Sequence, residues 1–146
     1  MKTVNKSVLL WYSPEEMYAL VTDIAAYPSF LPWCDHALVL ADEADGMTAE
    51  VGIAIGGVRQ SFTTRNRHTP GREVAMQLVS GPFSRLEGCW KFKPLADGKQ
   101  RASRVELLLH YGFDNPALGR LVGPVFDRIA GSLVDAFVKR AEQVYD

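Results

Sequence analysis

Residues 48–67 decide the fold class, and they read TAEVGIAIGGVRQSFTTRNR. The odd positions from 49 to 55 are all apolar, while the even positions carry Thr, Glu, Gly and Ala. Gly56-Gly57 interrupts this alternation, which then resumes with Phe62 on one parity and arginines on the other. Alternation on both sides of a glycine pair predicts two antiparallel strands joined by a short turn.

The same period of two continues on both sides of this hairpin. It covers residues 3–11, 73–79, 85–93 and 104–113. Turn residues separate these segments at Thr69-Pro70-Gly71, Gly81-Pro82 and Asp97-Gly98. Successive strands with short turns predict an antiparallel meander that has one apolar face and one solvated face.

A helix start is encoded at Ser13-Pro14-Glu15-Glu16. Ser13 can accept from a free backbone N–H, Pro14 has no N–H to satisfy, and Glu16 can reach back to the cap. Apolar residues follow at helical spacing, so we expect a helix of about three turns that ends near Ala25.

Residues 27–34 combine two prolines with three aromatic side chains and a leucine. The prolines exclude a long helix here. Because an apolar loop has to bury its side chains, we expect this segment to pack against the core or to line the mouth of a pocket.

The apolar period becomes helical after Asn115-Pro116. Residues 118–144 carry a wide apolar stripe over about seven turns. Pro124 lies inside the stripe, so we expect it to kink the helix or to divide a short first piece from a long second one.

These elements predict an α+β architecture in one domain, residues 1–146. A half-exposed sheet must cover its apolar face, and the long C-terminal helix is the obvious cover. A twisted antiparallel sheet wrapped around one helix leaves a gap in which a small apolar ligand could sit.

The composition is that of a globular protein. Hydrophobic residues make up 47% and charged residues 23%, which excludes a disordered or fibrous chain. No apolar run is long enough for a transmembrane helix, and the first residues do not form a signal peptide. Since Cys34 and Cys89 are far apart in such a chain, we expect a cytoplasmic protein with free thiols.

The net charge of −1 conceals segments of opposite sign. Residues 1–58 have a balance of −6, residues 59–104 of +7 and residues 105–146 of −2. The near-neutral total argues against a general coating of nucleic acid, and we expect no DNA partner.

Six cations of the basic segment share the outward parity of their strands: Arg59, Arg65, Arg67, Arg85, Lys91 and Lys93. Such a face can serve solubility and protect against edge pairing. The lack of compensating acids in this segment slightly favours the other interpretation, a surface that contacts rRNA phosphates or anionic lipid headgroups.

Several motifs together resemble a known family. Residues 23–34, DIAAYPSFLPWC, are the most specific, and residues 62–66, FTTRN, and 81–92, GPFSRLEGCWKF, extend the similarity, as does the helical end from 125 to 145. In these segments the chain resembles the ribosome association toxin/coenzyme Q-binding protein family of the START-like superfamily of polyketide cyclases and lipid-transfer proteins. The GPF segment is closer to the bacterial branch.

The resemblance implies a helix-grip fold, in which the sheet grips the C-terminal helix and short helices lie between the first two strands. It also implies two functions. One branch is associated with binding coenzyme Q or related lipids in support of respiration, and the other with binding the large ribosomal subunit and blocking subunit association.

No catalytic motif is present in the sequence. It has no Walker loop, dinucleotide fingerprint, His-Glu-x-x-His motif or nucleophile elbow, so we expect a protein that is not an enzyme and requires no cofactor. Cys34, His36, Cys89 and His110 could in principle hold a metal, but they lack the paired Cys-x-x-Cys spacing. Free cysteines and a surface histidine at position 110 are the favoured interpretation.

The aromatic side chains can be core residues or can line a cavity. A prenylated quinone needs apolar walls for its tail and donors for its two carbonyls. Candidate donors are Gln60, Thr64, Asn66 and Gln77. The residues predicted to line the cavity or its rim are Tyr27, Phe30, Leu31, Trp33, Ile53, Phe62, Trp90, Phe92, Leu109, Tyr111, Phe126, Ile129 and Leu133.

The sequence and the resemblance lead to one hypothesis and one alternative. The hypothesis is non-enzymatic binding of ubiquinone or a related isoprenoid lipid, with transient contact to a membrane surface. The alternative is a toxin that binds the large ribosomal subunit through the basic face.

Overall fold

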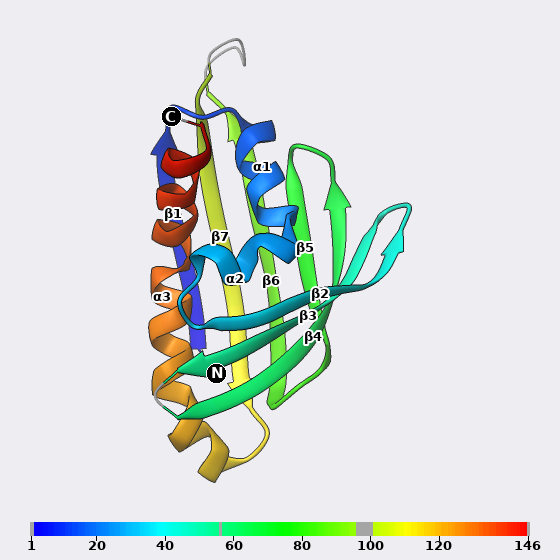
Figure 1. The fold of residues 1–146 in the computed structure, drawn as a ribbon, viewed down its shortest axis with the longest axis vertical. Coiled ribbons are helices and arrows are strands. Elements are labelled where there is room, and N and C mark those ends of the chain that lie inside the picture. Colours follow the sequence, from blue (N-terminus) through cyan, green and yellow to red (C-terminus); the bar gives the residue numbers. More distant parts are fainter. Residues whose placement is uncertain (1, 56, 96–100, 146) are drawn as a thin grey trace.

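A computed structural model describes residues 2–55, 57–95 and 101–145, apart from the side chains of Ile55 and Val58. Its strands form one antiparallel sheet in the order β1-β7-β6-β5-β4-β3-β2, so β1 and β2 are the edge strands (Figure 1). The strands are β1 Lys2–Leu10, β2 Cys34–Glu43, β3 Gly46–Ile55, β4 Val58–Thr69, β5 Glu73–Ser80, β6 Phe83–Pro94 and β7 Ser103–Phe113. The predicted meander is confirmed.

The turns and β2 add detail to this prediction. Gly71 has a φ of 71°, the left-handed conformation that the predicted turn after Thr69 requires. The predicted Asp97-Gly98 turn and Gly56 lie outside the described residues. Sequence alternation did not separate β2 as a strand, because its register shifts twice, between Cys34 and Ala37 and again after Val39.

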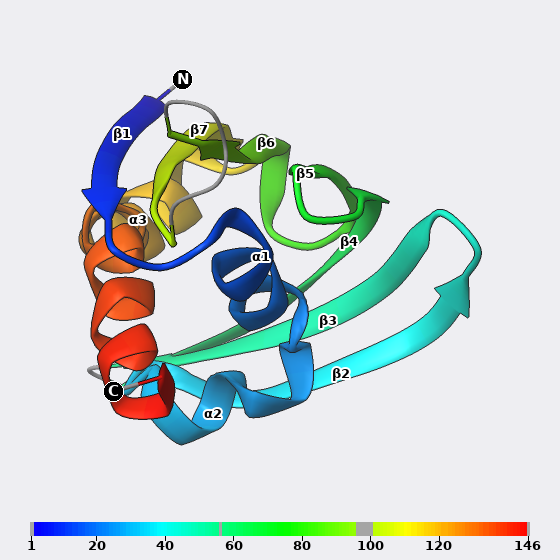
Figure 2. The ribbon, with the colours of Figure 1, turned by 90° about the horizontal axis from the view of Figure 1, so that it is seen from above.

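The sheet curves strongly around the helices. Figure 2 shows β1, β7, β6 and β5 along one side, with β4, β3 and β2 sweeping across to the other. Register shifts between Thr63 and Thr64 in β4 and between Phe83 and Arg85 in β6 mark places where bulges increase the twist. The curved sheet thereby acquires a concave face, on which the helices lie.

The N-terminal helices form as short pieces. In α1, Pro14–Thr22, the predicted capping box is confirmed: the Glu16 N–H donates to Ser13 Oγ at 3.1 Å, and the Ser13 N–H donates to Glu16 Oε1 at 2.9 Å. The predicted end of this helix near Ala25 is wrong, because Asp23 leaves helical geometry and a 3-10 turn, η1 Ile24–Ala26, follows. The proline-bounded segment contains a single turn, α2 Tyr27–Phe30.

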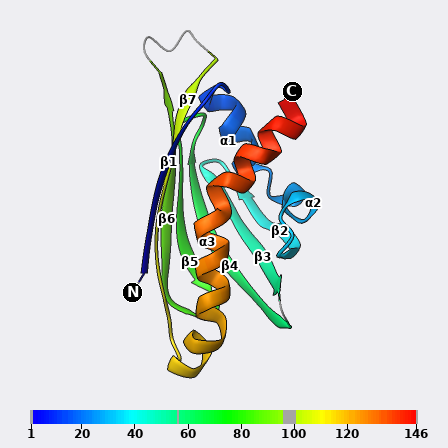
Figure 3. The ribbon, with the colours of Figure 1, turned by 90° about the vertical axis from the view of Figure 1, so that its left-hand side faces the viewer.

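The long helix α3, Pro116–Tyr145, lies across the concave face of the sheet (Figure 3). Asn115 caps it, since its Oδ1 accepts from the Ala117 N–H at 2.8 Å. Of the kink and the division expected at Pro124, the division is wrong, because the helix continues through this residue, and the kink stays a prediction. A proline removes one backbone donor and can be accommodated by a bend when both sides of the helix pack against the sheet.

Three clusters of buried side chains form the core. One lies under α1 and includes Met17, Phe92, Leu107 and Phe137. A second surrounds Phe126 at the N-terminal half of α3, and a third lies between η1, α2 and strands β2 and β3. None of the helices in the described ranges is both long and apolar enough to span a bilayer.

Candidate ligand-binding cavity

A cavity of about 100 Å³ lies between the concave face of the sheet and α3. It is enclosed by inward residues of β3 to β7, by one face of α3 and by the segment from η1 to Trp33. The lining residues are Ile24, Tyr27, Trp33, Ala49, Val51, Phe62, Thr64, Asn66, Met76, Leu86, Trp90, Leu109, Phe126, Ile129, Ala130, Leu133 and Phe137. The curvature of the sheet creates this space, because α1 fills the concave face only at the opposite end.

The wall of the cavity is apolar except for a buried pair on β4. The Thr64 hydroxyl donates to Asn66 Oδ1 at 2.7 Å, and both side chains are buried. Tyr27 also has a polar atom at the wall, but its hydroxyl donates to the backbone oxygen of Val21, and burial raises its pKa. The cavity can therefore hold an apolar molecule, and Thr64 and Asn66 are polar groups in its β4 wall.

Most of the predicted lining residues lie at this cavity. They are Tyr27, Trp33, Phe62, Trp90, Leu109, Phe126, Ile129 and Leu133. Among the four candidate donors, Thr64 and Asn66 line it, whereas Gln60 lies near Asp35 and His36, and Gln77 is exposed on the outer face. A role for these residues in ligand binding stays a prediction.

Five predicted residues do not line the cavity. Phe92 and Tyr111 are buried in packed clusters, and the Tyr111 hydroxyl donates to Asp127 Oδ1 at 2.6 Å. Ile53 and Leu31 are likewise core residues, and Phe30 faces a groove outside the cavity. Strand parity assigned Ile53, Phe92 and Tyr111 to the inner side, but parity does not say where along a curved sheet the helices leave space. Phe30 and Leu31 belong to the proline-bounded segment, where strand parity does not apply.

The prediction missed several lining residues: Ile24, Ala49, Val51, Met76, Leu86, Ala130 and Phe137. Ala49 and Val51 share the parity of Ile53, and Phe137 belongs to the apolar stripe of α3. A signal was therefore present for these three, although it also fits ordinary core residues.

A second space, a groove of about 500 Å³, adjoins the cavity on the outside. Trp33 and Ile129 line both spaces, so these two side chains form the wall between them. Arg128, Lys139 and Arg140 of α3 border the groove, and the Arg140 guanidinium lies 5.0 Å from the centre of the Phe30 ring. Within the described residues none of these three cations is part of an ion pair.

The predicted basic face differs from this groove. Arg59 pairs with Asp35 at 3.4 Å, and Lys93 pairs with Glu106 at 2.9 Å. Arg65 pairs with Asp45 at 2.6 Å, and Arg85 pairs with Glu87. Arg67 and Lys91 have no ion pair among the described residues. The expectation of missing acids is wrong, because neighbouring strands supply carboxylates that a count along one segment does not see.

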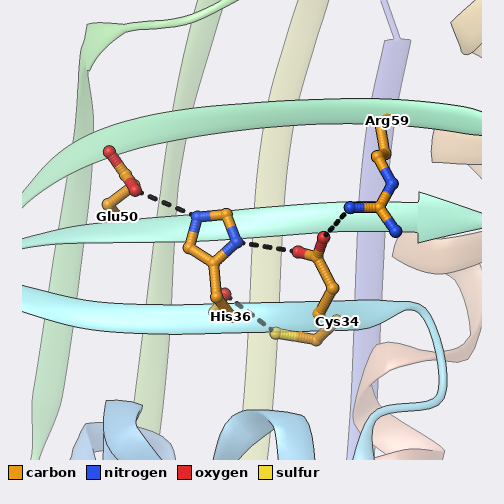
Figure 4. Close-up of polar contacts among 5 residues, drawn as sticks. Cys34, His36, Glu50 and Arg59 are labelled. Carbon is orange, nitrogen blue, oxygen red and sulfur yellow. Dashed lines mark hydrogen bonds and ion pairs between the residues drawn. The ribbon is translucent and has the colours of Figure 1, made fainter.

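A polar network crosses β2, β3 and β4 on the outer side of the sheet (Figure 4). His36 Nδ1 lies 2.8 Å from Asp35 Oδ1, and His36 Nε2 lies 3.0 Å from Glu50 Oε2. The bond to Glu50, together with Asp35, raises the pKa of His36. The ring fits because Gly52 has no side chain: a Cβ there would come within 2.3 Å of it.

The thiols show no sign of activation. Burial, with Asp35 nearby, raises the pKa of Cys34 to about 11, and the Cys34 Sγ donates to the His36 carbonyl oxygen at 3.4 Å. Burial and Glu73 likewise raise the pKa of Cys89 to about 11. Both cysteines are free, and in the described part of the chain no three His, Cys, Asp or Glu side chains are placed to hold a metal. His110 is on β7, where its Nδ1 lies 3.0 Å from Thr3 Oγ1.

Comparison with known proteins relates the sequence of this chain to one protein family. Residues 10–138 match the family model described as polyketide cyclase / dehydrase and lipid transport. The chain is 41% identical over 145 residues to a ribosome association toxin RatA of Vibrio cholerae, with 99% of both chains covered. It is 27% identical over 142 residues to the mitochondrial coenzyme Q-binding protein COQ10 homolog B of Xenopus laevis, covering 97% of this chain and 58% of that one.

A solved structure has the same fold as this chain. A START superfamily protein from Mycobacterium smegmatis superposes with a TM-score of 0.80 at 23% identity, covering 97% of this chain and 98% of that one. These matches confirm the resemblance drawn from the sequence motifs and the expected helix-grip fold. The chain therefore belongs to the polyketide cyclase / dehydrase and lipid transport family.

Proposed function

We propose that this protein binds a hydrophobic small molecule of the quinone or isoprenoid type in the cavity between sheet and α3, without converting it chemically. The observation that carries the proposal is the cavity itself, which has an apolar wall and a single buried polar pair, Thr64 and Asn66. Apolar walls with a few polar groups are typical of small-molecule sites.

The size of the cavity determines how such a ligand would fit. Ligand sites usually measure about 300–1,000 Å³, so a cavity of about 100 Å³ holds only part of a prenylated quinone. The outer groove of about 500 Å³ lies directly behind Trp33 and Ile129. The proposal is therefore that a ring or a first prenyl unit occupies the cavity, while the rest of the ligand passes Trp33 into the groove.

The polar pair gives the ligand an orientation. Because Thr64 donates to the carbonyl oxygen of Asn66, the Asn66 amide N–H groups are the donors that can meet a quinone carbonyl. A bond to a ligand carbonyl would satisfy a buried polar group that an apolar tail would leave unpaired. The ring of a quinone would therefore lie toward β4.

The first test is organic extraction of the purified protein followed by mass spectrometry, in which a co-purified quinone or isoprenoid supports the proposal. The second compares Trp33→Ala with Trp11→Ala, using quinone titration against protein fluorescence. Trp11 is 79% exposed and does not line the cavity, so it is a matched control. Loss of an aromatic anchor at a binding site weakens affinity by about tenfold or more, so we expect this effect for Trp33→Ala only.

Two results would contradict the proposal. One is a Trp33→Ala protein with a lower melting temperature and unchanged quinone affinity, which would make Trp33 a core residue. The other is wild-type protein that takes up no quinone at any salt concentration. Uptake into an apolar cavity should hardly respond to salt, in contrast to binding of a polyanion.

Binding to the large ribosomal subunit is the second candidate function. The observation that favours it is the 41% identity to relatives that are named ribosome association toxins. Most cations of the sheet face are ion-paired, whereas Arg128, Lys139 and Arg140 beside the outer groove have no ion pair with any residue that the structure describes. These three are therefore the better candidates for phosphate contacts.

Co-sedimentation with large ribosomal subunits over a salt series tests this candidate. Phosphate contacts release counterions, so binding should fall steeply with salt. Reversal of Arg128, Lys139 and Arg140 to Glu should abolish it, while reversal of the ion-paired Arg59, Arg65 and Lys93 to Glu should have the smaller effect. Wild-type protein that fails to co-sediment at low salt would exclude this function. If both triple variants bind as tightly as wild type, phosphate contacts at these sites are excluded.

A further inference from the structure

The outer edge of β2 is unusually apolar for a free sheet edge. Leu38, Val39 and Leu40 are 51, 43 and 53% exposed, although they are consecutive residues of a strand. Strand order ends at β2, so no strand of the described ranges pairs with its outer side. Figure 2 shows the β2–β3 hairpin projecting beyond the part of the sheet that α1 and α2 cover.

Free edges are normally protected by charged side chains, above all lysine, by proline, by bulges or by a covering element. Residues 34–55, which form this hairpin, contain no Lys, Arg or Pro. Two bulges in β2 shorten the regular part of the edge, which leaves room for one short partner strand. The edge therefore lacks lysine and proline, and the register shifts confine regular pairing to a length that suits a peptide rather than a domain.

The charge of the hairpin selects the kind of partner. It carries Asp35, Asp42, Glu43, Asp45 and Glu50. Arg59 pairs with Asp35, and Arg65 pairs with Glu43 and Asp45. His36 contacts Asp35 and Glu50, while Asp42 has no ion pair among the described residues. Acids remain in excess, so a second copy would bring two acidic hairpins together, whereas a cationic strand would meet opposite charge.

We propose that the β2 edge around Leu38, Val39 and Leu40 binds an extended cationic peptide, which adds to the sheet as an eighth strand. Main-chain hydrogen bonds along the free edge would provide affinity, and alternate side chains would cover the exposed leucines and valine. Acids near both ends of the edge would favour lysine or arginine at the ends of the peptide. This site is separate from the cavity and does not depend on the proposed ligand.

The probe is a short synthetic peptide that alternates valine and threonine between two lysines at each end. One control peptide has glutamates in place of the lysines, and another has a central proline, which cannot continue a strand ladder. Titration by amide NMR should show shifts at residues 37–43 and slowed hydrogen exchange there. The glutamate peptide should bind about tenfold more weakly or not at all, and the proline peptide should not protect these amides.

The matched protein variants are Leu38→Lys/Leu40→Lys and Leu121→Lys. All three leucines are exposed, so the substitutions leave the core intact, and Leu121 lies on α3 away from the edge. We expect the double variant to bind about tenfold more weakly or worse, and Leu121→Lys to bind like wild type.

Three results would overturn the proposal. Equal binding of the proline peptide would reduce the interaction to general electrostatics. Shifts confined to other regions would place the peptide elsewhere. A dimer in sedimentation analysis that the double variant abolishes would show that a second copy covers the edge instead.

Discussion

The space between the sheet and α3 has a packed half and a hollow half, and two residues of one strand represent them. Leu107 and Leu109 are neighbouring inward positions of β7, and both are buried. Leu107 belongs to the cluster under α1, with Met17 and Phe92, whereas Leu109 belongs to the cluster around Phe126 and also lines the cavity. Identical residue types on one strand and one parity thus have different surroundings.

The difference follows from where a third layer is available. In the packed half, Met17 and Leu20 of α1 pack between the sheet and α3. The ring centres of Tyr18 and Phe92 lie 5.9 Å apart. In the hollow half the sheet curves away (Figure 2). There Ile24, Tyr27 and Trp33 line the space together with residues of the sheet and α3. The position of α1 therefore decides which inward side chains belong to the packed core and which line the cavity.

Alanine at the two leucines should separate the halves most clearly. Leu107→Ala should lower the free energy of unfolding by about 3–5 kcal/mol, because the packed cluster cannot collapse around the missing atoms. Leu109→Ala should cost about 2 kcal/mol, since this side chain already borders a void and loses fewer contacts. Denaturant unfolding measures both values, and equal losses would mean that the hollow half is packed in solution.

The polar pair in the hollow half should show the cost of an unpaired group. Thr64→Val removes the donor to Asn66 Oδ1 and should lower the free energy of unfolding by about 1–3 kcal/mol. Thr64→Val/Asn66→Leu removes both partners and should recover most of this loss, although quinone affinity should fall. The comparison is made by denaturant unfolding without ligand, and a double variant less stable than the single one would argue against a buried pair.

The helix cap should affect the packed half alone. Ser13→Ala removes one side of the capping box of α1 and should cost about 1 kcal/mol. Because α1 does not line the cavity, quinone affinity should stay unchanged. Thermal unfolding and a quinone titration of the same variant test this, and a parallel loss of affinity would couple the two halves.

The smallest effects concern pH, and their signs are opposite for Glu16 on α1 and for His36 on the outer side of β2. Arg101, together with Ser13, lowers the pKa of Glu16 on α1 from 4.5 to about 2, so this carboxylate stabilises the fold above pH 4.5 and less as the pH falls toward 2. Glu50 raises the pKa of His36 above 6.5, so this contact stabilises fully below pH 6.5 and is lost as the pH rises through the raised pKa.

Each partly exposed pair should contribute about 1 kcal/mol or less. Unfolding free energies of wild type, Glu16→Gln and His36→Gln across the pH range provide the measurement. Glu16→Gln should flatten the loss in acid, and His36→Gln should flatten the loss above pH 6.5. Variants with the same pH profile as wild type would show that neither contact persists in solution.

Local patterns were sufficient for most of the elements and for the faces they bury, although not for β2 or for the end of α1. Alternation placed Phe62, Thr64 and Asn66 on one side of a strand and Arg65 on the other, since side-chain direction in a strand depends only on parity. The cap at Ser13 is likewise a property of adjacent residues. The proline-bounded segment around Trp33 is expected to pack against the core or to line a pocket mouth, and Trp33 lines the cavity. Parity and the helical stripe account for further lining residues such as Phe62, Trp90 and Ile129.

Three features depend on residues far apart in the chain, and only the folded molecule decides them. The cavity ends where α1 fills the concave face, so Phe92 is core and Trp90 also borders the void. The charge of the outer face depends on acids that neighbouring strands bring to Arg59 and Lys93. The exposure of Leu38 depends on the place of β2 at the sheet edge. Each of these features depends on contacts between separate elements, and the periodicity within one element does not show which elements will meet.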